Sequence, residues 1–102
     1  MLIGNSSKKP SLKMVRRIKH TLHEALGLSE DAMITVTQLA CLEEDCAPLE
    51  TVIGLLRPKA PQLQHKLHKP TDDVGVDDLI QVCEAWGYHI QNTLIDSVFK
   101  EN

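Results

Sequence analysis

The spacing of apolar residues changes twice along this chain, and these two changes limit the folds that it can adopt. From Leu12 to Leu26 the apolar residues recur every three or four positions, which is the period of an α-helix. From Met33 to His68 they alternate with polar residues or form short β-branched runs, which is typical of strands. Helical spacing returns after Thr71 and continues to Phe99. A helix, an extended middle and a helical end together predict an α+β fold.

The first helix has a start signal and a stop signal. Ser11 suits the N-cap position, and Gly27 suits the left-handed residue that closes a helix. Residues 1–10 combine turn formers with lysines and show no periodicity, so we expect a flexible N-terminal tail there. The remaining residues, 11–102, are numerous enough for one hydrophobic core and predict a single domain.

Three extended segments follow the helix, and the second of them is ambiguous. They are Met33–Cys41, Leu49–Leu56 and Gln62–His68. Residues 49–56 also fit one face of a helix, but the run is short, is rich in β-branched residues and contains Gly54, so we predict a strand. Short connections make consecutive strands antiparallel. We therefore expect a three-stranded antiparallel sheet with helices packed on one face, in the order α-β-β-β-α(α).

The C-terminal region has two runs of helical spacing separated by a glycine. The first run contains Leu79, Val82, Cys83 and Trp86, and Gly87 should stop or bend this helix. Ile90, Leu94, Val98 and Phe99 continue the spacing to the end of the chain. The acidic pairs that precede the first run, residues 72–73 and 77–78, suit the positive end of a helix dipole.

Charged residues are strongly segregated, although the net charge is only −3. The first 23 residues contain six basic residues and no acidic one, whereas Glu24 to Glu50 contains seven acidic residues and no basic one. Blocks of opposite charge commonly pair across a fold. Basic residues that remain exposed are candidates for binding a partner, and these are Lys13, Arg16, Arg17, Lys19, Lys66 and Lys69.

Thiols and imidazoles are expected to meet at one end of the sheet. In a meander, Cys41 ends the first strand, Cys46 precedes the second, and His65 and His68 end the third. Two thiolates and two imidazoles suffice for a tetrahedral zinc site, although strand alternation directs His65 and His68 to opposite faces. Two alternatives stay open. Cys41 could be a buried strand residue and Cys46 a loop thiol, or the two thiols could form a reversible disulfide around the acidic residues 43–45.

Several functions are disfavoured by what the sequence lacks. It contains no glycine-rich phosphate loop and no Gly-x-Ser-x-Gly element, so we expect no enzymatic activity. The three aromatic residues are too few for a base-stacking surface, and the isoelectric point of about 5.9 is low for a nucleic-acid binder. No apolar run approaches the length of a membrane span. The odd number of cysteines suits a reducing compartment, which predicts a cytoplasmic protein.

The leading hypothesis is a small non-enzymatic binding or adaptor domain that needs no cofactor. It would dock a protein partner through its charged faces and sheet-end loops, with a homodimer as one form of association. The alternative is a metal-binding, zinc-type protein or a thiol-redox protein that uses Cys41 and Cys46 with His65 and His68. A third hypothesis is weak nucleic-acid binding by the basic first helix.

Overall fold

The order of helices and strands agrees with the prediction from the sequence. The computed structural model describes residues 10–40 and 49–101, so the predicted tail lies outside the described residues except for Pro10. The elements are α1 (Leu12–Ala25), β1 (Met33–Ala40), β2 (Leu49–Leu56), β3 (Leu63–Leu67), the short 3-10 helix η2 (Thr71–Asp73), α2 (Val76–Ala85) and α3 (Asn92–Glu101).

Both ends of α1 form as its sequence predicts. The Ser11 Oγ accepts a hydrogen bond from the Met14 amide at 3.0 Å, which satisfies one of the free amides of the first turn. Gly27 closes the helix with a φ of +60°. The Ser11 amide also donates to Asp72 Oδ1 at 3.0 Å, so the start of α1 is attached to η2.

The sheet is an antiparallel meander with β2 in the centre, and residues 49–56 are a strand. Ile53 of β2 faces Val36 of β1 on one side and His65 of β3 on the other. Thr51, Ile53 and Leu55 are fully buried, which shows that these alternate positions of β2 point into the core. β3 begins one residue later than predicted, at Leu63, and ends one residue earlier, at Leu67, whereas the predicted last residue of β1, Cys41, lies outside the described residues.

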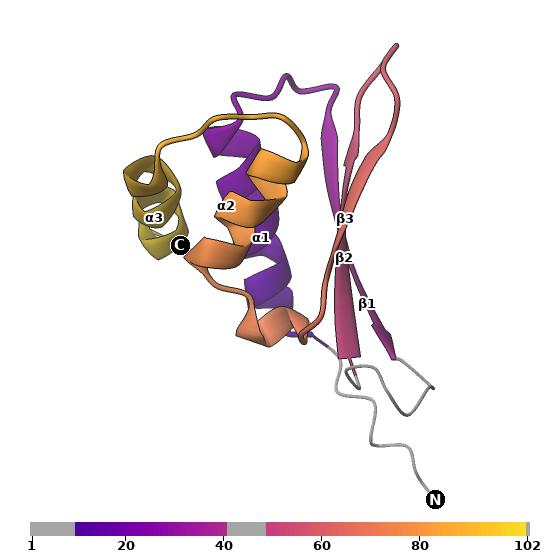
Figure 1. The fold of residues 1–102 in the computed structure, drawn as a ribbon, viewed down its shortest axis with the longest axis vertical. Coiled ribbons are helices and arrows are strands. Elements are labelled where there is room, and N and C mark those ends of the chain that lie inside the picture. Colours follow the sequence, from indigo (N-terminus) through magenta and orange to yellow (C-terminus); the bar gives the residue numbers. More distant parts are fainter. Residues whose placement is uncertain (1–9, 41–48, 102) are drawn as a thin grey trace, which may run out of the picture.

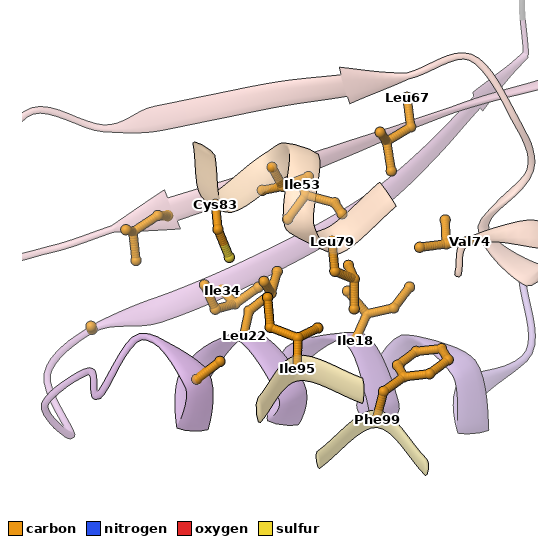
Figure 2. Packing of buried hydrophobic residues seen from close by; sticks show 14 residues of the cluster. Ile18, Leu22, Ile34, Ile53, Leu67, Val74, Leu79, Cys83, Ile95 and Phe99 are labelled. Atoms are coloured by element: carbon orange, nitrogen blue, oxygen red, sulfur yellow. The ribbon is translucent and has the colours of Figure 1, made fainter. Parts of the chain in front are cut away.

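The helices cover one face of the sheet, as Figure 1 shows. α1 and α2 lie against the strands, and α3 packs on their outer side. No described residue forms a second layer on the opposite face. The shared core is aliphatic. Its fully buried members include Leu55 and, labelled in Figure 2, Ile18, Leu22, Ile53, Leu79 and Ile95.

A buried polar network fixes the connection between β3 and α2. Thr51 Oγ1 donates to the Lys69 carbonyl at 2.8 Å and lies 3.0 Å from Thr71 Oγ1. The Thr71 amide donates to Gln38 Oε1 at 2.9 Å, which connects η2 to β1. Asp78 Oδ2 accepts from the Gly75 amide at 2.9 Å, so an acidic side chain does stabilise the start of α2.

Gly87 stops the C-terminal helical region instead of bending it. Its φ of +87° is a conformation that residues with side chains rarely adopt. α2 therefore ends at Ala85, and α3 begins as a separate helix at Asn92. This break allows Ile95 and Phe99 of α3 to pack over α1 (Figure 2).

Candidate functional site

A groove with a volume of about 460 Å³ lies between α1 and the beginning of β1. Its helical wall is formed by Arg16, Lys19, His20 and His23, and its other wall by Ala32, Met33 and Ile34. The four helical residues are spaced so that they occupy one face over two turns of α1. The groove therefore combines a basic wall with an apolar one.

The amphipathic pattern of α1 creates the basic wall. Ile18 and Leu22 point into the core, so Lys19 and His20 are exposed on the helix surface. His23 Nε2 lies 3.1 Å from the Ser29 carbonyl, which holds the turn between α1 and β1. Within the described residues, the side chains of Arg16, Lys19 and His20 have no hydrogen-bond or ion-pair partner.

The apolar wall belongs to an edge strand. β1 pairs with β2 on one side, and no described strand lies on its other side. An edge strand exposes backbone amides and carbonyls that have no partner in the sheet. Met33, at the start of β1, is 59% exposed, so the sheet side of the groove offers an apolar contact.

The other basic residues proposed from the sequence divide into one exposed residue and three that have internal partners. Lys13 is exposed on α1 outside the groove. Arg17 Nε donates to the Phe99 carbonyl at 2.6 Å, and its guanidinium group lies 4.3 Å from the centre of the Phe99 ring, so Arg17 joins α1 to α3. Lys69 Nζ lies 2.9 Å from Asp78 Oδ1, and Lys66 Nζ lies 3.6 Å from Glu50 Oε1.

Glu50 organises a small charged cluster on the sheet face opposite the helices. Its Oε2 lies 2.9 Å from His68 Nδ1, and only 8% of the residue is exposed. No motif in the sequence singles out Glu50. Its partner follows from strand register, because Thr51 pairs with Leu67 and the next antiparallel pair joins Glu50 to His68.

The predicted metal ligands are only partly within the described residues. His68 contacts Glu50, whereas His65 Nε2 accepts a hydrogen bond from the Gln81 amide of α2 at 3.0 Å, so the two imidazoles lie on opposite faces. Cys41 and Cys46 lie outside the described residues. Among residues 10–40 and 49–101, no group of three His, Cys, Asp or Glu side chains is placed to hold a metal ion. Zinc binding therefore stays an untested alternative.

Two other features do not form a chemical site. A second hollow of about 300 Å³ lies between α2 and α3, and its polar lining consists of Asp77, Asn92, Thr93 and Asp96. Cys83 is buried in the core, where loss of hydration and the nearby Glu84 carboxylate raise the pKa of its thiol to about 11. This thiol is protonated at neutral pH and is a poor nucleophile.

The comparisons with known proteins add no assignment to this geometry. No protein-family model matches the chain, and no curated protein or solved structure matches it. In the described part of the chain, no helix has the length and apolar character needed to cross a bilayer.

Proposed function

We propose that this chain is a non-enzymatic, cytoplasmic binding domain that docks an acidic segment of a partner protein in the groove between α1 and β1. The observation that carries the proposal is which basic side chains have an acidic partner within the fold. Lys66 and Lys69 pair with Glu50 and Asp78, whereas Arg16 and Lys19 in the groove have no acidic partner among the described residues.

This division matters because the chain has an excess of acidic residues. With a net charge of −3, internal pairing could have neutralised every basic side chain. Arg16 and Lys19, which have no acidic partner among the described residues, line the groove together with Met33, whose side chain is exposed. A basic rim next to an apolar contact suits a protein partner, because rim charges guide association while apolar contacts hold the complex together.

The acidic residues near the groove favour a short peptide over a nucleic acid as the partner. Glu24, Glu30 and Asp31 are exposed near the end of α1 and would repel a continuous phosphate backbone. A short acidic segment can place its carboxylates at Arg16 and Lys19 and avoid these residues. The odd number of cysteines supports a reducing, cytoplasmic location.

A peptide selection with matched charge reversals tests the proposal. Random peptides displayed on phage are selected against the full chain, and the affinity of the enriched peptides is measured for the wild type, Lys19→Glu and Lys13→Glu. Reversing a charge that contacts the peptide removes an attraction of about 0.2–1 kcal/mol and adds a repulsion of similar size. The reversal of a groove residue should therefore lower the affinity for an acidic peptide roughly tenfold.

The control is Lys13→Glu, because it makes the same charge change on the same helix outside the groove. We expect acidic peptides to be enriched, Lys19→Glu to weaken them and Lys13→Glu to leave them nearly unchanged. Enriched peptides without acidic residues, or equal effects of the two reversals, would overturn the proposal.

A further inference from the structure

We infer that the groove takes its ligand as an added β-strand: an extended peptide with acidic residues at alternate positions pairs with the edge of β1 that no described strand covers. This inference rests on the proposed function and specifies how the partner is bound. It follows from the difference between the two edges of the sheet, the position of α1 and the charge of the groove.

The two edge strands differ in how they are protected. β3 has five residues, carries Lys66 and lies between Pro61 and Pro70. Short length, lysine and flanking proline are features that keep other chains from pairing with an edge. β1 has eight residues, and its sequence MITVTQLA contains no charged residue and no proline. Among the described residues, the edge of β1 therefore has no feature that opposes pairing, whereas the edge of β3 has several.

The helix beside β1 supplies specificity. Inward-facing residues of β1, such as Ile34, point to the helical layer, and the same must hold for alternate residues of a strand added next to it. Those side chains would lie over the exposed face of α1, where Arg16, Lys19 and His20 line the groove. Figure 1 shows that α1 runs along the strands and not across them.

The spacings of the two elements agree. Alternate side chains of a strand are about 6.6–6.8 Å apart, and one helical turn advances about 5.4 Å. Two acidic residues at alternate positions can therefore meet successive turns of α1, at Arg16 and at Lys19 or His20. The peptide backbone would supply the hydrogen bonds, and the acidic side chains would select the ligand.

Charge distinguishes this occupant from a second copy of the chain. If two β1 edges paired around a two-fold axis, the two α1 helices would lie side by side at the junction. Arg16 and Lys19 of each copy would then face the same residues of the other, which is unfavourable. An acidic peptide replaces this repulsion with attraction.

Synthetic octapeptides of three designs and matched chemistry test the inference with the full chain. The first has Glu at alternate positions with Thr and Val between them, and the second has the same composition with its Glu residues adjacent. The third is the alternating peptide with methyl groups on alternate backbone nitrogens, prepared in both registers. Fluorescence anisotropy measures their affinities, and hydrogen exchange of the β1 amides locates the bound peptide.

We expect the alternating peptide to bind at least tenfold more tightly than the peptide with adjacent Glu residues. Methylation should abolish binding in one register and be tolerated in the other, because alternate amides of a strand point to opposite sides. Exchange should slow at β1 amides and remain unchanged in β3. Lys19→Glu should weaken the alternating peptide, while Lys13→Glu should not.

The other outcomes have distinct meanings. One outcome is that the peptides bind, that Lys19→Glu weakens this binding, and that neither the order of the Glu residues nor methylation affects it. This outcome would overturn strand addition and leave the proposed function intact. No binding by any of the peptides would also overturn strand addition, while the phage selection would decide the proposed function independently. Without peptide, hydrogen exchange of the β1 amides that becomes slower as the protein concentration rises would show that a second copy of the chain pairs with this edge, and would overturn the inference.

Discussion

Gly54 is the position where a single added methyl group should have the most informative effect. It lies in the central strand directly opposite Thr35, and a Cβ at Gly54 would be 2.5 Å from Thr35 Oγ1. This distance is well below the roughly 3.5–4.0 Å at which non-bonded contacts are optimal. The next neighbours, the Leu63 carbonyl oxygen at 3.6 Å and Gln64 Cγ at 3.9 Å, leave ordinary room. The conflict therefore involves one side chain.

Two opposing terms determine the effect of Gly54→Ala. Overpacking costs about 1–3 kcal/mol, and here we expect a cost of about 1.5 kcal/mol, because the strain consists of moving the Thr35 side chain away from its rotamer. Alanine lowers the conformational entropy of the unfolded chain, which raises the free energy of unfolding by about 0.4–1 kcal/mol. This gain applies at Gly54 because its φ is not positive, so alanine can adopt the same backbone conformation. We expect a net loss of about 1 kcal/mol of unfolding free energy in the wild type. In a Thr35→Ala background the same change should stabilise by about 0.5 kcal/mol.

Urea unfolding of the wild type, the two single variants and the double variant measures this coupling. We expect the cycle to give an interaction energy of about 1.5 kcal/mol and the sign of the Gly54→Ala effect to reverse. Independent sites usually add within about 0.3–0.5 kcal/mol. A coupling inside that range would refute the argument that Thr35 is the obstacle.

Two further predictions concern the cysteines. With a thiol pKa of about 11, Cys83 should react with iodoacetamide at pH 8 only after the chain unfolds, and peptide mass spectrometry that finds rapid alkylation of Cys83 in the folded protein would contradict this. The free energy of unfolding should also fall as the pH rises from about 9 to 11, because in this range the thiol loses its proton only in the unfolded chain. Native mass spectrometry of protein purified without chelator should show no stoichiometric zinc, because His65 and His68 lie on opposite faces of the sheet. Bound zinc that is lost in the Cys41→Ser variant and retained in the Cys83→Ser variant would establish the metal site instead.

The fold was predictable because its signals are local. Ser11 and Gly27 limit α1 through the chemistry of their own positions. Residues 49–56 fit a helical face as well as a strand, and the prediction of a strand was correct because β-branched side chains and Gly54 disfavour a helix. The alternation within residues 62–68 also placed His65 and His68 on opposite faces before any strand was paired.

The division of the basic residues was not predictable from the sequence, because it depends on contacts between distant residues. Arg16 and Arg17 are adjacent in the chain, yet Arg17 binds the Phe99 carbonyl and Arg16 lines the groove. Successive helical positions differ by about 100° in direction, so one of the two turns to α3 and the other to the edge of β1. Which direction leads to which neighbour is known only when α3 is placed.

Edge protection shows how topology changes the meaning of a sequence pattern. The prolines around β3 and Lys66 within it were visible from the start, and so was the uncharged sequence of β1. These features acquire a meaning once β2 is known to be central, because only edge strands need protection. An uncharged strand in the middle of a sheet requires no explanation, whereas the same strand at an edge beside unpaired cations does. The topology thus turns an ordinary run of residues into the main support for the proposed strand addition at the edge of β1.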